Sequence, residues 1–406
     1  MPPKPLLPVA DALASIEKAI SALPAETLPL AEILGRYAAC DYNAALTSPA
    51  QPVSAMDGYA ARFEDVASLP RTLIQRDISA AGKPSAHKLQ PGEVVRIFTG
   101  AVVPSGADTI ILQEDTEAKG EEILVKEASP KGRYIRPAGM DFSAGDTLIS
   151  AFQPLRARHL GLLASAGIER ASVCASPRVA IINSGDELVP VGTVPSAGQL
   201  VNSNGIMLSA MIKALGGTPI CLAPIEDKAG ALHERLEAQG PFDLIVTTGG
   251  ASVGDHDHIV SDLENDPQSQ LGFWRIAMRP GKPLIFANWR SQPLLGLPGN
   301  PVSTAVCSLL FVRQAICALQ GRPADIAYQT AKLATDLPEN DRREDYLRAT
   351  LSVDADGQAL AHPFAKQDSA MLSRLTMADC LIIRAPHARP AKAGGSVSIL
   401  TFPPLF

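Results

Sequence analysis

Short apolar runs alternate with amphipathic segments along the middle of the chain, from residue 177 to residue 321. A continuous apolar run is typical of a strand buried on both faces of a parallel sheet, whereas apolar residues three and four positions apart indicate a helix. Strands that alternate with helices predict a doubly wound parallel sheet. The predicted strands are 179–182, 219–223, 244–248 and 294–297, and the predicted helices are 206–215, 227–238 and 302–319.

The segments on either side of this region have different patterns. Helical spacing over 11–23, 30–37 and 156–167 predicts a small domain formed from two separate parts of the chain. Between residues 44 and 141, strand-like runs alternate with Pro-Gly, Ser-Gly and Lys-Gly turns, which is typical of a β-rich domain. After residue 322, strand-like runs without a long helix predict a small β-barrel or sandwich.

We therefore expect a multidomain α/β plus β fold. Its parts are a central doubly wound parallel αβ domain, an inserted β-rich domain, a discontinuous domain that contains helices, and a C-terminal β-barrel. The expected ranges are 1–43 with 142–172 for the discontinuous N-terminal domain, 44–141 for the β-rich insertion, 173–321 for the αβ domain and 322–406 for the barrel.

Composition and charge narrow the function classes. The chain has 406 residues, which is too long for one ordinary core, and its 46% apolar and 19% charged residues are typical of a globular protein. A net charge of −6 without long basic runs argues against nucleic acid or an anionic membrane as partner. The six cysteines form no CxxC pair, and no segment reaches 18 apolar residues, so we expect a cytoplasmic protein without a disulfide framework.

The strand predicted at 244–248 runs into a sequence that favours phosphate binding. Adjacent glycines let backbone N–H groups approach an anion, and hydroxyl groups can add donors. Carboxylates that follow such a turn suit Mg²⁺, which binds oxygen ligands and bridges to phosphate. By itself this stretch also fits a glycine-rich loop with solvated acids. The residues concerned are Thr247, Thr248, Gly249, Gly250 and Ser252, followed by Asp255 and Asp257.

Four stretches together resemble the MoeA family, the molybdopterin molybdenumtransferases, which also includes the E-domain of gephyrin. The stretches are 54–60, 99–114, 247–257, and 278–283 with 296–303. The resemblance spans nearly the whole chain. It implies insertion of molybdate into adenylylated molybdopterin, with Mg²⁺-dependent release of AMP, on a homodimer. Hand-over of substrate from the adenylyltransferase and of product to molybdoenzymes would follow.

The resemblance also assigns roles to individual residues. Glu187 and Asp257 would bind Mg²⁺, and the β-rich domain would contribute its residues from the other subunit. The implied catalytic residues are Asp57, Thr99, Asp141, Glu187, Asp227, Asp257 and Lys282. The implied substrate-binding residues are Thr248, Gly249, Gly250, Ser252, Arg275, Arg279, Pro298, Gly299, Asn300, Ser303, Arg348 and Ser369, with Ser373 as an alternative to Ser369.

Several alternatives stay open. Asp227 alone is better explained as a solvated strand-exit acid or a helix N-cap, and Asp57 could equally be a turn residue before Gly58. His256 and His258 are interpreted as exposed polar residues rather than metal ligands. Two other functions compete: a molybdopterin adenylyltransferase, which needs only the αβ domain, and a scaffold of the gephyrin type. The intact polar positions and the additional domains favour the molybdenumtransferase over both.

Overall fold

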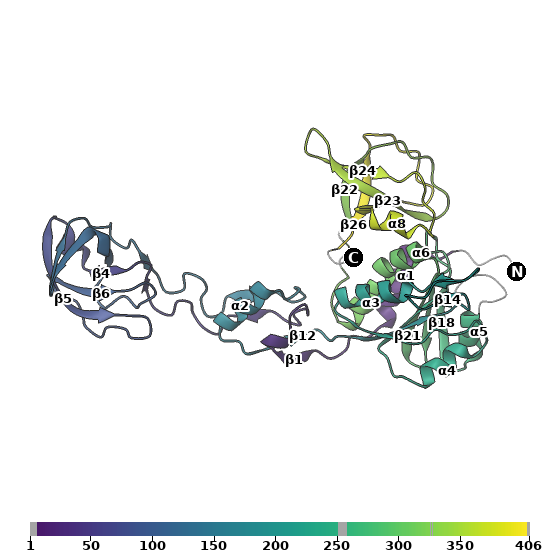
Figure 1. The fold of residues 1–406 in the computed structure, drawn as a ribbon, viewed down its shortest axis with the longest axis horizontal. Helices are drawn as coiled ribbons and strands as arrows, with labels where there is room; N and C mark the ends of the chain where they lie inside the picture. Colours follow the sequence, from purple (N-terminus) through teal and green to yellow (C-terminus); the bar gives the residue numbers. More distant parts are fainter. Residues whose placement is uncertain (1–5, 251–257, 325, 327, 404–406) are drawn as a thin grey trace. The chain divides into compact units, whose positions relative to one another are not determined.

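The computed structural model describes residues 6–250, 258–324, 326 and 328–403 (Figure 1). Two compact units make up the chain, and each is considered by itself: one contains Met1–Glu26 with Val173–Phe406, and the other contains Thr27–Ser172. The N-terminal helix α1 (Val9–Ala19) therefore packs with the αβ region and not with residues 142–172, beside which the sequence pattern placed it. Its apolar side chains Val9, Ala12 and Ile16 enter the core there.

A six-stranded sheet forms the centre of the first unit. Its order is β16-β13-β17-β21-β20-β18, and the first four strands run parallel, as the apolar runs predicted. The last two strands are antiparallel to their neighbours, so the sheet is mixed at this edge. The strands are β13 Arg178–Asn183, β16 Thr218–Cys221, β17 Leu244–Thr248, β18 Ser269–Trp274, β20 Ile285–Trp289 and β21 Gln292–Leu297, with a separate small pair formed by β14 Leu188–Val189 and β15 Leu200–Val201.

Helices cover both faces of this sheet (Figure 1). Alternate residues of β13 point to opposite cores: Val179 and Ile181 pack with α1, α3 and α6, whereas Ala180 and Ile182 pack with α4 and α5. Burial on both faces explains why these strands are continuous apolar runs. The helices are α3 Asn204–Ala214, α4 Ala231–Glu237, α5 His258–Asn265, α6 Pro301–Cys307 and α7 Arg313–Leu319, and the π-helical turn η4 Ser308–Val312 joins the last two.

Two predicted helix features are wrong. Helix α4 begins after Gly230, so Asp227 is not its N-cap and is available for another role. The helix predicted at 30–37 is a single 3-10 turn, η1 Leu30–Glu32, which follows the end of β1 at Pro29 and is followed by Gly35 in the left-handed conformation.

The segment Pro301–Leu319 is long and apolar enough to cross a membrane by length and composition. Within the described residues it is the only such helix, and 89% of its most apolar window is buried inside the protein. Its residues pack against the central sheet in the same core as α1 and α3. A segment buried to this extent against the sheet is a core helix of the protein.

The C-terminal part of the first unit is a closed five-stranded barrel, as predicted. The strands follow the order β23-β24-β22-β26-β25, and pairing of β25 with β23 closes the ring. The short strand β19 (Met278–Arg279) adds to the outside of β23 and thereby joins the barrel to the αβ region. The barrel elements are β22 Tyr328–Leu333, β23 Glu344–Val353, β24 Ala359–Pro363, β25 Cys380–Arg384, β26 Ser396–Thr401 and the short helix α8 Leu372–Thr376.

The second unit is β-rich and contains a six-stranded sheet of order β7-β4-β6-β5-β9-β8. Backbone packs closely here: a Cβ atom on Gly58 would lie 1.9 Å from the Ile111 carbonyl oxygen, so only glycine fits at this position of β4. The elements are β1 Glu26–Pro29, β2 Tyr42–Asn43, β3 Val53–Ser54, β4 Gly58–Ala61, η2 Phe63–Val66, β5 Arg71–Ser79, β6 Glu93–Ile97, β7 Thr109–Leu112, η3 Gln113–Asp115, β8 Thr116–Lys119, β9 Glu122–Val125, β10 Ile135–Arg136, β11 Thr147–Ile149, α2 Ala157–Ser165 and β12 Arg170–Val173.

Candidate functional site

A cavity of about 540 Å³ opens at the carboxyl ends of the parallel strands β13, β17 and β21. Ligands of doubly wound sheets bind at this edge, where the connections on either side of a strand diverge to opposite faces. Residues that the sequence predicted separately meet here. The cavity is lined by Ser184, Glu187, Leu188, Leu200, Val201, Asn202, Ser203, Asn204, Thr248, Gly249, Gly250, Pro283, Pro298, Gly299, Asn300, Pro301 and Ala370.

The glycine turn after β17 forms one wall of this cavity. Gly249 and Gly250 have φ values of +82° and +62°, and a Cβ atom on Gly249 would lie 2.2 Å from the Ser184 carbonyl oxygen. Only glycine fits at position 249, because a larger residue would push the turn away from the backbone at Ser184. Its N–H group donates to the Leu297 carbonyl oxygen at 3.2 Å, so this amide is already used within the sheet.

The two threonine hydroxyl groups that were predicted as donors have different surroundings. Thr248 donates to the Asn183 side-chain oxygen at 2.9 Å in the interior. Thr247 is fully buried, and its hydroxyl has no hydrogen-bond partner among the described residues. Ser252, the third predicted hydroxyl donor, lies outside the described residues. The Thr248 hydroxyl thus links the ends of β17 and β13, and a role of the threonine hydroxyl groups in ligand binding stays a prediction.

Two helices begin at the cavity. Helix α3 follows Ser203 and helix α6 follows Asn300, and neither N-cap side chain bonds to its own first turn. The N-terminus of a helix carries a partial positive charge and unpaired N–H groups, which favour an anion. Part of this capacity is already used, because Asn202 accepts from Gly205 and Ser369 accepts from Val302. The remaining donors make this edge of the sheet suitable for phosphate groups.

The carboxylates differ in their surroundings. Glu187 is exposed at the cavity and makes no ion pair or side-chain hydrogen bond with a described residue. Asp227 accepts a hydrogen bond from the Ser184 hydroxyl at 2.6 Å and lines a small neighbouring pocket together with Gly250 and His258. Asp257 lies outside the described residues, as do Asp255 and His256. Among the residues that are described, no group of three His, Cys, Asp or Glu side chains is placed to hold a metal ion.

The three predicted cations have different environments. Arg279 forms a bidentate ion pair with the buried Asp345, and this hydrogen bonding raises the pKa of Arg279. Arg275 stacks on the Trp274 ring, with the guanidinium carbon 3.8 Å from the ring centre. Lys282 makes no ion pair with any residue in the described ranges. Asp345 already balances the charge of Arg279, and Arg275 stacks on Trp274, so we expect Lys282, which has neither kind of contact with a described residue, to attract an additional anion.

Arg348 supports a loop of the barrel. Its side chain is only 2% exposed, and it donates to the Gln367 side-chain oxygen at 3.1 Å and to the Asp368 carbonyl oxygen at 2.8 Å. Burial lowers the pKa of Arg348. The supported loop brings Ser369 to the cavity edge, where its hydroxyl accepts a hydrogen bond from the Asn300 side chain at 3.0 Å. Of the two predicted serines, Ser369 is therefore beside the αβ residues, whereas Ser373 lies within α8.

The remaining predicted contacts of α6 lie at its start. Pro298 is buried at the cavity wall, and its carbonyl oxygen accepts from the Thr304 hydroxyl at 2.6 Å. Ser303 is 4% exposed in the first turn of the helix. A side chain this deeply buried can contribute its backbone N–H more readily than its hydroxyl.

In the second unit, Asp57 and Thr99 form a pair. The backbone N–H and the hydroxyl of Thr99 both donate to one Asp57 carboxylate oxygen, at 2.7 Å and 2.8 Å. These bonds, the backbone one first, lower the pKa of Asp57, which stays ionised. Asp141 is exposed and its side chain is not part of this pair. Asp57 therefore does more than form a turn, because Thr99 fixes the direction of its carboxylate.

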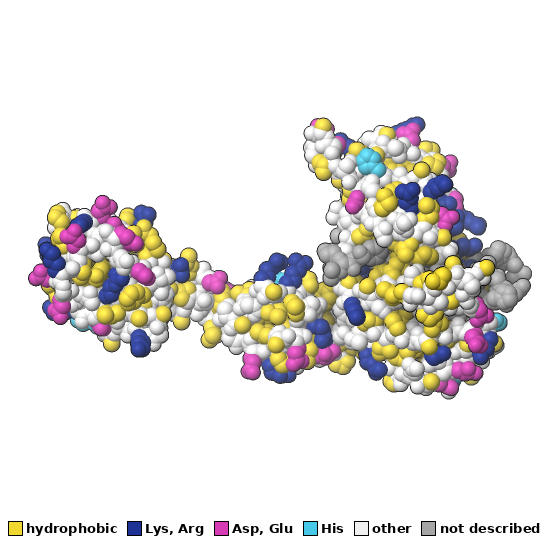
Figure 2. Space-filling model, viewed as in Figure 1, with side chains coloured by type: hydrophobic (Ala, Val, Ile, Leu, Met, Phe, Trp, Pro, Cys, Tyr) yellow, Lys and Arg dark blue, Asp and Glu magenta, His cyan; other side chains and the backbone are white. Residues whose placement is uncertain are grey.

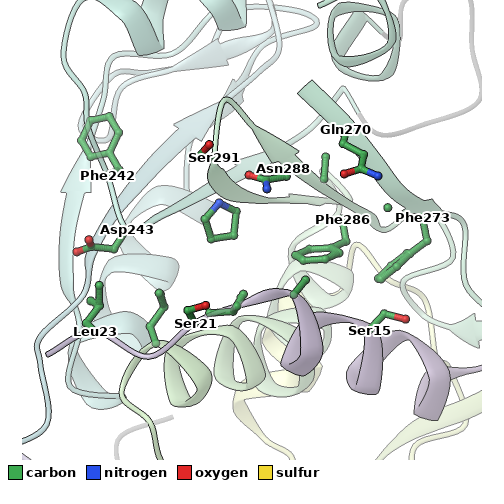
Figure 3. Close-up of a pocket in the computed structure, with 16 residues that line it drawn as sticks. Ser15, Ser21, Leu23, Phe242, Asp243, Gln270, Phe273, Phe286, Asn288 and Ser291 are labelled. Carbon is green, nitrogen blue, oxygen red and sulfur yellow. The ribbon is translucent and has the colours of Figure 1, made fainter. Parts of the chain in front are cut away.

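A second cavity, of about 480 Å³, lies between α1 and the β18–β20 edge of the central sheet (Figure 3). Phe273 and Phe286 lie side by side in it, with ring centres 5.6 Å apart, and polar side chains such as Gln270 and Asn288 stand around them. Asp243 is the only charged residue among its described lining residues. A cavity with a carboxylate and no cation does not suit a polyanionic ligand.

Sequence reasoning missed Asn204, the first residue of α3, although it lies in the main cavity. The available signal was the polar run Asn202-Ser203-Asn204 directly before the apolar segment of the predicted helix 206–215. The distribution of charged side chains did not help to locate the site. On the face seen in Figure 2, acidic and basic side chains are interspersed, in keeping with the small net charge of −6.

Comparison with known proteins gives one consistent result. Three protein-family models match successive parts of the chain: the MoeA N-terminal region (domain I and II) over residues 7–167, a probable molybdopterin binding domain over 180–318, and the MoeA C-terminal region (domain IV) over 330–402. A molybdopterin molybdenumtransferase of Nostoc sp. is 33% identical over 381 residues, covering 91% of this chain and 87% of that protein. The protein of the same name from Haemophilus influenzae is 32% identical, covering 93% and 94%.

Solved structures agree with these relatives. Two crystal structures of molybdopterin biosynthesis MoeA proteins from Pyrococcus horikoshii cover 98% of this chain and 100% of their own. Their sequence identities are 29% and 25%, and their TM-scores are 0.83 and 0.79. The predicted multidomain fold class is thereby confirmed.

Proposed function

The chain belongs to the MoeA family of molybdopterin molybdenumtransferases, and from this premise we propose how its own residues transfer molybdenum to molybdopterin. The substrate would be adenylylated molybdopterin, which carries a dithiolene, a phosphate and an adenylyl group. Molybdate supplies the metal, and AMP leaves when the bond between the two phosphates is hydrolysed. The observation that carries the proposal is the cavity where a glycine turn, two helix N-termini and Glu187 meet.

This cavity has the means to bind a substrate with several negative charges. Gly249 and Gly250 let phosphate oxygens approach the backbone, and the starts of α3 and α6 supply N–H donors with a positive potential. Some of its residues are held by hydrogen bonds before the substrate binds, since Asn204 donates to Gly299 and Asn300 donates to Ser369. Such preorganised donors stabilise developing charge without reorganising during the reaction.

The donor set fits Mg²⁺ as proposed cofactor. Mg²⁺ binds to proteins through one or two carboxylates and keeps waters or substrate phosphates as its other ligands. Glu187 offers a carboxylate without a described partner at the cavity, so it would hold the ion, with Asp257 as the second proposed ligand. When bound, Mg²⁺ would neutralise charge on the phosphates. Asp227, whose carboxylate accepts from Ser184 and lines a small pocket with Gly250, would orient a water molecule.

We further propose that the enzyme is a cytoplasmic homodimer. In this proposal the Asp57–Thr99 pair of one subunit acts on the substrate held by the partner, and Asp141 contributes from the same subunit as Asp57. The proposal follows what the resemblance implies, and the carboxylate of Asp57, whose direction Thr99 fixes, supports a role for this pair. Receipt of substrate from an adenylyltransferase and delivery of product to molybdoenzymes belong to the same proposal.

Gly249→Ala is expected to weaken AMP binding at least about tenfold, since a Cβ atom 2.2 Å from the Ser184 oxygen must displace the turn. The measurement is isothermal titration of AMP into the purified chain. Gly192→Ala is the matched control, because Gly192 also has a positive φ of +93° but has open space around its Cβ position. Equal AMP affinities for the wild type and Gly249→Ala would remove the glycine turn from the proposed site.

Lys282→Ala is expected to raise the molybdate concentration needed for half-maximal insertion by about tenfold, and to change AMP affinity by less than about twofold. The reason is that Lys282 has neither an ion pair nor a ring contact with a described residue, whereas Arg279 pairs with Asp345 and Arg275 stacks on Trp274. Molybdate dependence of insertion and AMP titration are measured on the same preparation. Lys213→Ala, at an exposed position of α3, controls for the loss of one positive charge. Equal shifts in both quantities would contradict a role specific to molybdate.

Reconstitution tests the proposed function directly. Purified protein, adenylylated molybdopterin, molybdate and Mg²⁺ should give AMP and molybdenum cofactor in equal amounts. An adenylyltransferase would instead consume ATP and molybdopterin, and a scaffold would turn over neither substrate. The barrel loop that reaches Asn300 through Ser369 favours the molybdenumtransferase, because the αβ domain of an adenylyltransferase works without a barrel.

A further inference from the structure

The side-chain oxygen of Asn204 is a buried acceptor without a donor among the residues that the structure describes. Asn204 is the first residue of α3 and is 9% exposed. It lines the cavity at the carboxyl ends of β13, β17 and β21. Its side-chain nitrogen donates to the Gly299 carbonyl oxygen at 2.8 Å. Its side-chain oxygen is buried and receives no hydrogen bond from the described residues. A buried acceptor left without a donor is costly, so this oxygen is suited to accept from a bound ligand.

The orientation of the Asn204 amide is fixed by its neighbour. A carbonyl oxygen such as that of Gly299 can only accept, so the amide nitrogen must face it, and rotating the amide would bring two oxygens together. The Asn204 oxygen therefore points away from Gly299. The space next to the Asn204 oxygen therefore favours an O–H or N–H donor and disfavours a second acceptor.

The location indicates which donor of the substrate is nearest. Gly299 packs against the glycine turn, since a Cβ atom on Gly299 would lie 3.5 Å from the Gly249 Cα atom. Asn204 is thus one residue away from the backbone that is proposed to hold phosphate. In a nucleotide, the two ribose hydroxyl groups lie closer to the 5′ phosphate than the amino group of adenine does.

We propose that the Asn204 side-chain oxygen accepts a hydrogen bond from a ribose hydroxyl of the adenylyl group, and that this contact makes the site selective for ribonucleotides. The inference rests on the proposed function, because it takes the adenylyl group as the ligand of this cavity. A site that presents a buried acceptor discriminates against a ligand without the matching donor, because the acceptor is then left unpaired. Asn204 would be a specificity-determining residue.

The test compares four nucleotides by isothermal titration into the full chain: AMP, 2′-deoxy-AMP, 3′-deoxy-AMP and purine riboside 5′-monophosphate, which lacks the amino group. One deoxy analogue is expected to bind the wild type about tenfold more weakly than AMP, and the purine riboside is expected to bind like AMP. In Asn204→Leu the four affinities should become equal. If the leucine variant does not fold, Asn204→Ala replaces it in the same titrations. Thermal melting checks that the variant used is folded.

Asn288→Leu is the matched control, because it changes an exposed asparagine of the second cavity and should leave all four affinities unchanged. The inference is overturned if AMP and both deoxy analogues bind the wild type equally, if the Asn204 variants keep the discrimination, or if loss of the amino group is what weakens binding. In each of these cases AMP still binds and the proposed function stands. Failure of the wild type to bind AMP at all would overturn both.

Discussion

Glu187→Gln should reduce Mg²⁺-dependent release of AMP by at least about 100-fold while the fold stays intact. Glutamine keeps the size of the side chain but removes the negative charge, and Glu187 is exposed at the cavity without a described partner that would lose a contact. The measurement is AMP formed per enzyme from adenylylated molybdopterin and molybdate over a series of Mg²⁺ concentrations. Thermal melting curves should coincide with those of the wild type.

The control for this change is Glu264→Gln, which removes the same charge from an exposed position of α5. It should leave both the rate and the Mg²⁺ dependence unaltered. Full turnover of Glu187→Gln at saturating Mg²⁺ with an unchanged Mg²⁺ midpoint would show that this carboxylate is not a metal ligand. The free energy of unfolding should then still match the wild type, which separates a wrong assignment from a damaged fold.

Mixing Asp57→Ala chains with Glu187→Gln chains is expected to restore about a quarter of wild-type activity, although each variant alone is inactive. Under the proposed exchange of residues between subunits, random mixing makes half of the dimers mixed, and each mixed dimer has one site with both changes and one with neither. Activity is measured after the subunits have exchanged, and native mass spectrometry confirms the mixed dimer.

The matched control is a mixture of Asp57→Ala with Thr99→Val. Both changes affect the same hydrogen-bonded pair, so every site in that mixed dimer carries a change and no recovery is expected. If the mixture of Asp57→Ala and Glu187→Gln also stays inactive once mixed dimers have formed, the two groups act within one chain. A monomeric protein with full activity would contradict the homodimer as well.

The strands that are buried on both faces were predicted well because their pattern is local. Val179 to Ile182 and Leu244 to Val246 are continuous apolar runs, and these residues are fully buried in the sheet. The antiparallel edge was not predicted, since β18 and β20 have no feature in their sequence that fixes their direction. Direction depends on which strand a segment pairs with, and that is decided by the connections and by the packing of the helices.

In the candidate site, too, local sequence patterns predicted some features, and tertiary contacts decided the others. Glycine at 249 and the turn it permits could be inferred from the adjacent glycines, and the structure places Gly249, Glu187 and Asn300 around one cavity. The hydrogen-bond partner of each side chain could not be inferred from the sequence. Asp227 is bonded by Ser184 instead of capping a helix, and the Thr248 hydroxyl turns inward to Asn183. These partners lie 43 and 65 residues away along the chain.

The sequence by itself determined the order of αβ, β-rich and barrel segments, because periodic burial leaves a periodic pattern of apolar residues. It also determined where glycine and proline interrupt that pattern. Only the tertiary structure decided which charges are already balanced: Arg279 meets Asp345 through a pairing of β19 with β23, 66 residues apart, whereas Lys282 has no described partner. It likewise decided that the Asn204 side-chain oxygen at the cavity has no donor among the described residues. Hydrogen bonds and ion pairs act over a few ångströms in space, and spacing along the chain does not encode such contacts.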